Sequence, residues 1–177
     1  MSKKFFMIYL NFMRHAKTDC SSYNGNDFNK PVSRNGILQI EAVKKFLKTK
    51  NISYDFYFCS PSTRTKQTLE YLLNNESVKK RHIVEDFNLY EGDNDNFLLR
   101  LSKVKGFKNI LVITHEPQIS YFIDFFLSEN NHSGKISQIQ IVTSSIISIK
   151  FNVDRWNLIS NHNAEFFQFI DPNKLFK

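Results

Sequence analysis

The stretch NILVITHEPQISYFIDFFL, residues 109–127, decides the fold class of this chain. Its first part, NILVIT, is the clearest buried strand in the sequence, because a parallel strand covered on both faces requires a near-continuous apolar run. Pro117 follows shortly afterwards, where its missing N–H suits the first turn of a helix. Apolar residues then recur at helical spacing: Ile119, Phe122, Ile123, Phe126 and Leu127. A strand that passes directly into an amphipathic helix is typical of a βαβ unit.

The same alternation extends toward the N-terminus. The patterns predict strands at residues 5–13, 54–60 and 81–84, and helices that follow Ser33, follow Pro61 and span residues 95–104. Residues 5–13, after Lys3 and Lys4, also imitate a secretory signal, but no small-residue cleavage site follows, so we interpret them as the first strand. Strands that alternate with helices predict a mainly parallel sheet covered on both faces.

The pattern changes near the C-terminus. Residues 138–151 alternate strictly between apolar and polar, which predicts an antiparallel hairpin arm or edge strand that closes the sheet. Residues 156–177 suggest a final strand and helix without site residues. Without repeats or linkers, residues 1–177 form one domain in this interpretation. The predicted fold class is a three-layer α/β/α domain with a mainly parallel sheet and an antiparallel edge strand.

Composition limits the possible environments and partners. The 177 residues are 41% hydrophobic and contain two cysteines, which form no CxxC pair, so a reducing, cytoplasmic compartment fits best. No apolar run approaches the roughly 18 residues of a membrane span. The net charge of +7 comes from basic residues dispersed along the chain, without a nucleic-acid-binding motif. We therefore expect neither a membrane nor a nucleic acid as partner; a salt-dependent nucleic-acid binder stays a distant alternative.

Four predicted strand ends carry reactive side chains. Ligands of open α/β sheets bind beyond the carboxyl ends of the strands. Those ends lead to Arg14 and His15, to Ser60 followed by Arg64, to Glu91, and to His115. Ser60 and Ser145 lack the GxSxG surroundings of a serine nucleophile. The remaining histidines have no such placement and are expected to be structural: His82, His132 and His162.

This set of residues suits phosphoryl transfer. Arginine forks match phosphate oxygens, and helix N-termini add backbone donors. Charge on the transferring group could thus be stabilised without a metal ion or cofactor. A neutral imidazole could attack phosphorus and form a phosphohistidine, while a carboxylate protonates the leaving group and then activates water.

Three sequence blocks resemble the histidine phosphatase superfamily, which has the phosphoglycerate-mutase-like fold. MRHAKT (13–18) is similar to its RHG/RHA signature, CSPSTRTKQTLEYL (59–72) to its second block, and ITHEP (113–117) to its third. The intervening segments DFNKPVSRNG (27–36) and LYEGDNDNFLLRL (89–101), with the strand VTSSIISIKF (142–151), resemble the branch of SixA-type phosphohistidine phosphatases. Ala16 stands where mutases have glycine, which is usual in this branch and argues against a mutase.

The resemblance implies roles for individual residues. His15 is expected to be the phosphorylated nucleophile, and Arg14, Arg64 and His115 to complete the phosphate pocket. Thr18 is a further candidate for phosphate binding, and Glu91 a candidate proton donor.

The expected activity is that of a metal-independent phosphatase (EC 3.1.3 type) acting on phosphohistidine in a signalling phosphotransfer protein. Two alternatives stay open: a phosphatase for a small molecule such as a sugar phosphate or nucleotide, and a phosphoprotein-binding module without turnover.

Overall fold

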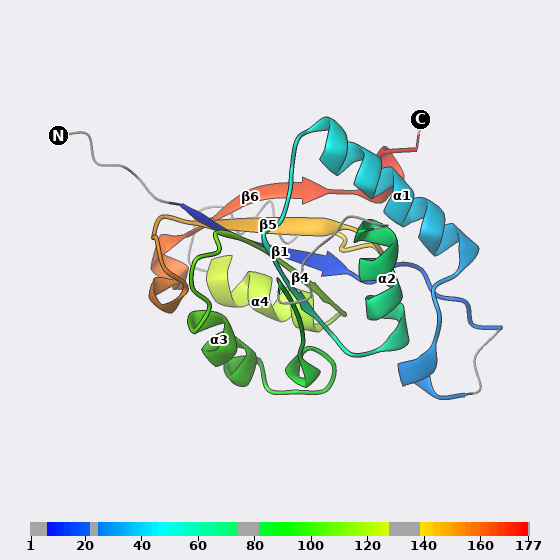
Figure 1. Cartoon of the computed structure of the whole chain (residues 1–177), viewed down its shortest axis with the longest axis horizontal. Coiled ribbons are helices and arrows are strands. Elements are labelled where there is room, and N and C mark those ends of the chain that lie inside the picture. The colour runs from blue at the N-terminus through cyan, green and yellow to red at the C-terminus, as the bar shows by residue number, and fades with distance from the viewer. Residues whose placement is uncertain (1–6, 22–24, 74–81, 128–138, 177) are drawn as a thin grey trace.

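A computed structural model describes residues 7–21, 25–73, 82–127 and 139–176 of the chain. Its six-stranded sheet has the order β3-β2-β4-β1-β5-β6. Strands β1 to β4 are mutually parallel, whereas β5 is antiparallel to both of its neighbours (Figure 1). The bounds are Ile8–Arg14 for β1, Phe56–Cys59 for β2, Ile83–Glu85 for β3, Asn109–Thr114 for β4, Ile146–Phe151 for β5 and Ala164–Ile170 for β6.

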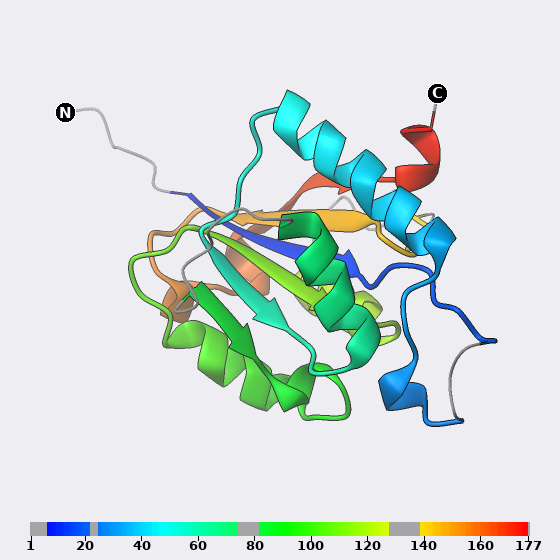
Figure 2. The ribbon, with the colours of Figure 1, turned by 45° about the vertical axis from the view of Figure 1, so that its right-hand side comes forward.

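Helices cover the sheet on both faces, as predicted. Helices α1 (Arg34–Thr49) and α2 (Thr63–Leu73) bury their apolar sides in a core cluster on one face (Figure 2). Helices α3 (Asn94–Ser102) and α4 (Gln118–Leu127) pack into a second cluster on the other face. The rings of Phe12 in β1 and Phe122 in α4 stack with centroids 5.1 Å apart. The predicted three-layer α/β/α class is thus confirmed.

Sequence signals account for several element boundaries. Ser33 caps α1 as predicted, because its side chain accepts a hydrogen bond from the N–H of Gly36 at 3.1 Å. Gly36 also lets the helix approach the preceding loop closely, since a Cβ atom there would lie 2.2 Å from the carbonyl oxygen of Lys17. No helix among the described residues is long and apolar enough to cross a membrane.

Two predictions for the C-terminal part were wrong in detail. Strand β5 begins at Ile146, because the backbone preceding it binds the end of β1 instead of a neighbouring strand. The N–H of Ser144, for example, donates to the carbonyl oxygens of Arg14 and His15. Strand β5 is the antiparallel hairpin arm of the two alternatives, because it pairs with β6. The edge position belongs to β6, which is the predicted final strand. The expected terminal helix is only a three-residue 3-10 turn, Pro172–Lys174, which Asp171 caps.

Parts of some predictions lie outside the described residues. These are residues 5 and 6 of the first strand, Arg81 of the third, Gln138 and the structural assignment of His132. The other two structural histidines lie at the amino ends of strands, away from the carboxyl ends that carry the candidate site. The ring of His82 packs 5.0 Å from that of Phe107, and His162 lies in the short turn Asn161–Asn163.

Candidate active site

His15 follows directly on the carboxyl end of β1. The backbone N–H of His15 donates to the backbone carbonyl oxygen of Thr114 at the end of β4, which links the two strand ends. Its ring Nδ1 lies 2.8 Å from the carbonyl oxygen of Ala16. A carbonyl oxygen can only accept, so Nδ1 carries the proton and Nε2 of the neutral ring keeps its lone pair. Burial, with Arg64 and Arg14 adding to its effect, lowers the pKa of His15 to about 4, so the ring is neutral at neutral pH.

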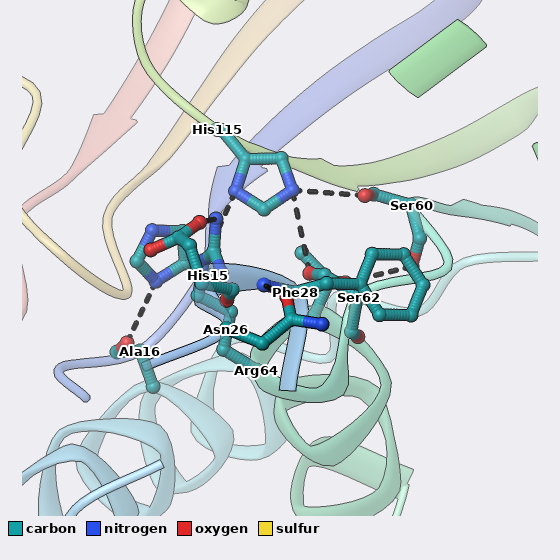
Figure 3. Close-up of polar contacts among 10 residues, drawn as sticks. His15, Ala16, Asn26, Phe28, Ser60, Ser62, Arg64 and His115 are labelled. Carbon is teal, nitrogen blue, oxygen red and sulfur yellow. Dashed lines mark hydrogen bonds and ion pairs between the residues drawn. The ribbon is translucent and has the colours of Figure 1, made fainter. Parts of the chain in front are cut away.

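His115 follows β4 in the same way and faces His15, with the ring centroids 5.1 Å apart (Figure 3). Nε of Arg64 donates to its Nδ1 at 3.3 Å, so Nδ1 is the unprotonated nitrogen. Its Nε2 then donates to Oγ of Ser60 at 2.8 Å. Burial lowers the pKa of His115 to about 3, with the neighbouring His15 and the two arginines in support. Both imidazoles are therefore neutral, with opposite tautomers.

The guanidinium of Arg64, in the first turn of α2, is held on several sides. Nη1 donates to the carbonyl oxygen of Asp27 at 2.6 Å, and Nη2 lies 2.8 Å from the Asp27 carboxylate. The ring of Tyr90 lies 5.9 Å from the guanidinium carbon. Arg64 is buried, whereas the Asp27 side chain is 63% exposed at the rim. The fixed guanidinium presents its charge toward the two histidines.

Arg14 supplies the second guanidinium. Its Nη1 donates to the carbonyl oxygen of Ile141 at 2.7 Å, which anchors the side chain to the segment before β5. Its Nε is buried and has no hydrogen-bond partner within the described part of the chain. An unpaired buried donor on a charged group is costly, so an anion bound here would be stabilised by the available N–H.

A hydroxyl network fixes the turn between β2 and α2. Ser62 and Thr65 share a hydrogen bond of 2.8 Å, and Thr65 Oγ1 also lies 2.7 Å from the carbonyl oxygen of Ser60. Ser62 Oγ is 3.5 Å from Nε2 of His115, farther than the oxygen of Ser60 (Figure 3). This network holds Ser60 in place as the acceptor for His115.

The structure thus brings Arg14, His15, Arg64 and His115 together, as the sequence predicted. Glu91 is exposed and lines a hollow of about 500 Å³ that also reaches His115. The carboxylate that acts electrostatically on His15 is Asp27. Thr18 forms a backbone bridge with Val32, which places it in the loop that carries Asp27.

Three contributors were missed by reasoning from sequence. Ser60 lies at a predicted strand end, where its sequence context argues only against a nucleophile, although a hydroxyl there can equally orient a histidine. Asp27 lies in a loop whose only signal was its likeness to a family segment. The Ile141 carbonyl that holds Arg14 gives no sequence signal, because any residue has a carbonyl group. Among the described residues, no three His, Cys, Asp or Glu side chains cluster as metal ligands would.

Comparisons with known proteins concern the family and the fold. The sequence profile of the histidine phosphatase superfamily (branch 1) matches residues 10–97, which include His15 and Arg64 and stop before His115. No curated protein sequence matches the chain. Together, the fold, the site and the profile confirm the predicted resemblance to the histidine phosphatase superfamily.

The structural neighbours include SixA phosphohistidine phosphatases. A SixA protein histidine phosphatase complexed with tungstate has a TM-score of 0.74 and 22% identity, with 95% of this chain and 99% of the other covered. A proposed SixA from Nakamurella multipartitia reaches a TM-score of 0.78 at 20% identity, with coverages of 94% and 96%. An alpha-ribazole phosphatase from Shigella flexneri has a TM-score of 0.68 at 15% identity, with coverages of 93% and 97%. At these identities the likeness concerns the fold.

Proposed function

We propose that this chain is a phosphohistidine phosphatase that acts through a covalent phosphohistidine intermediate on His15. The observation that carries the proposal is the tautomer of His15. The Ala16 carbonyl holds the proton on Nδ1, and the lowered pKa keeps Nε2 unprotonated between two arginines. A neutral, oriented imidazole beside two guanidinium groups is what nucleophilic attack on a phosphoryl group requires.

In the first step, the lone pair of His15 Nε2 forms a bond to phosphorus while the bond from phosphorus to the substrate's imidazole nitrogen breaks. The electron pair of the broken bond stays on that nitrogen as its lone pair, and because the other ring nitrogen of the substrate's phosphohistidine already carries a proton, the imidazole leaves neutral. Arg14 and Arg64 neutralise the charge on the three equatorial oxygens of the transferring group. The unpaired Nε of Arg14 gives this step a hydrogen-bond donor that no described residue uses.

In the second step, a water oxygen attacks the phosphorus of phosphorylated His15, the bond to Nε2 breaks, and inorganic phosphate and free His15 result. A carboxylate takes the proton from water. Asp27 and Glu91 are the two candidates for that role: Asp27 acts electrostatically on His15, and Glu91 lines the hollow beside His115. A leaving imidazole that is already protonated needs no strong acid in the first step.

The preferred substrate is a phosphorylated protein, such as a histidine phosphotransfer domain of a cytoplasmic signalling relay. SixA phosphatases among the structural neighbours support this choice. A small phosphomonoester is the second candidate, because the alpha-ribazole phosphatase shares the fold over nearly the whole chain. The positive charge for phosphate binding comes from the side chains of Arg14 and Arg64, so we propose that turnover is metal-independent.

Competing substrates test this proposal. We expect kcat/KM for a chemically phosphorylated histidine protein to exceed that for sugar phosphates and nucleotides by at least about tenfold, which corresponds to about 1.4 kcal/mol. EDTA should leave the rate unchanged, and vanadate should inhibit. Strong turnover of a small phosphomonoester without turnover of phosphohistidine would assign the chain to the second candidate function.

A further inference from the structure

A hollow opens on the α4 side of His115 and is continuous with the proposed site. Its volume is about 500 Å³, within the range of roughly 300–1,000 Å³ that is usual for binding sites. We call it the acidic hollow; its lining includes Tyr90, Glu91, His115, Glu116, Tyr121 and Asp124. The phosphate pocket and the acidic hollow share His115, so a group seated in the hollow lies beside the transferring phosphoryl group.

The charge of the hollow is opposite to that of the protein. Its lining holds three carboxylates, those of Glu91, Glu116 and Asp124, and no Lys or Arg among the residues that the structure describes. The whole chain has a net charge of +7. Oε2 of Glu116 accepts from Ser120 Oγ at 2.6 Å, whereas its Oε1 is buried and has no donor within the described segments. The hollow therefore offers an acceptor and negative charge to a cationic group.

An exposed aromatic pair adjoins the hollow on α4. Tyr121, which lines the hollow, is 41% exposed and Phe125 is 44% exposed. Their rings lie nearly parallel, at 12°, with centroids 6.1 Å apart. Aromatic side chains in such positions are typical anchors of protein interfaces, because they bury a large area at a low cost in side-chain entropy.

We propose that the acidic hollow and the Tyr121–Phe125 pair dock the polypeptide around the phosphorylated residue, and that they select a Lys or Arg next to an apolar side chain. The inference rests on the proposed function and specifies the partner's chemistry. The arginines of the phosphate pocket bind the anionic phosphoryl group, and the carboxylates bind the neighbouring cation. An anionic small phosphomonoester gains nothing from the hollow.

Two synthetic peptides test the selection directly. Each contains a single histidine, phosphorylated with phosphoramidate; one flanks it with Lys and Leu, the other with Glu and Ser. We expect kcat/KM for the Lys-Leu peptide to be higher by about tenfold at low salt, and the difference to shrink as salt rises. Equal kcat/KM values for the two peptides would overturn the docking inference and leave the phosphohistidine phosphatase proposal intact. Turnover of neither peptide, with turnover of p-nitrophenyl phosphate, would overturn both.

A charge reversal locates the effect in the hollow. Asp124 is exposed on α4, so Asp124→Lys should fold normally. It should lower kcat/KM for the Lys-Leu peptide by about five- to tenfold and change that for p-nitrophenyl phosphate by less than about twofold. Glu41→Lys on α1, across the sheet, makes the same change of charge at another exposed position and should have no effect on either substrate.

Three outcomes of the variants would overturn the inference. The first is an Asp124→Lys enzyme with unchanged peptide turnover. The second is an equal loss in Glu41→Lys, which would reduce the effect to net charge. The third is a wild-type dimer that Asp124→Lys dissociates without a change in peptide preference, which would assign the hollow to a second copy of the chain.

Discussion

Replacing Ser60 by alanine tests the orientation of His115. Ser60 is fully buried, and its Oγ accepts from Nε2 of His115 at 2.8 Å. Arg64 approaches the other ring nitrogen, so the ring is fixed from both sides. Ser60→Ala removes this acceptor. The buried Nε2–H of His115 is then left with Oγ of Ser62, 3.5 Å away, as its nearest remaining acceptor in the site.

The expected loss follows from the cost of an unsatisfied buried donor. That cost is about 1–3 kcal/mol, and each 1.4 kcal/mol is tenfold in rate. Ser60→Ala should therefore lower kcat/KM by about fivefold to 100-fold. Ser62→Ala is the matched control, because it removes a buried hydroxyl from the same turn without removing the short contact to His115. Its effect on kcat/KM should stay below about threefold.

Steady-state turnover of p-nitrophenyl phosphate at neutral pH measures both variants, and thermal unfolding shows that each is folded. Nitrogen chemical shifts of His115 report the ring directly: the wild type should show a proton on Nε2, and Ser60→Ala a mixture of tautomers. A Ser60→Ala enzyme with wild-type kcat/KM, or equal losses in the two variants, would refute the orientation of His115 by Ser60.

Four further predictions concern charge in the site. After correction for substrate ionisation, the acid limb of kcat/KM should fall near pH 4, because burial lowers the pKa of His15 to about 4; a limb at pH 6.5 would contradict this. Unfolding restores the ordinary His15 pKa of 6.5, so between pH 6.5 and pH 4 the unfolded chain binds more protons at this residue than the folded protein does. The free energy of unfolding should therefore decrease as the pH falls from 6.5 to 4. Arg64→Lys keeps the charge but loses the fork, and kcat/KM should drop by about 100-fold, whereas a drop below threefold would argue against a guanidinium requirement. Asp27→Asn removes negative charge from the rim, while the backbone carbonyl of residue 27 still binds Arg64. Vanadate should therefore inhibit this variant about two- to fivefold more strongly than the wild type. Weaker inhibition would show that the carboxylate mainly positions Arg64.

Local patterns were sufficient to predict most of the fold. The apolar run in β4 and the spacing along α4 depend on burial against the sheet, which periodicity reports directly. The segment before β5 was misjudged because Ile139 and Ile141 alternate as a strand does, and both pack against the core. Their backbone is not part of the sheet, since the carbonyl of Ile141 binds a side chain 127 residues away. A backbone carbonyl that binds a distant side chain instead of a neighbouring strand leaves no signal in the local sequence.

The site, like the fold, could be predicted where local patterns decide it and not where long-range contacts do. Strand ends converge in any parallel sheet, so His15 and His115 could be placed together from their positions alone. The partners that set their tautomers could not, because Ala16 and Ser60 act through single oxygen atoms whose direction depends on the folded turn. Asp27 reaches Arg64 across 37 residues, a contact that neither spacing nor composition indicates.

The central claim is that His15 carries the phosphoryl group. Mass spectrometry after a rapid quench with phosphoramidate or a phosphohistidine protein tests it most directly. The account predicts one added phosphoryl group on His15, absent in His15→Ala, which should fold normally and lack turnover. Release of phosphate without an adduct, or a His15→Ala enzyme with near wild-type activity, would contradict the covalent mechanism.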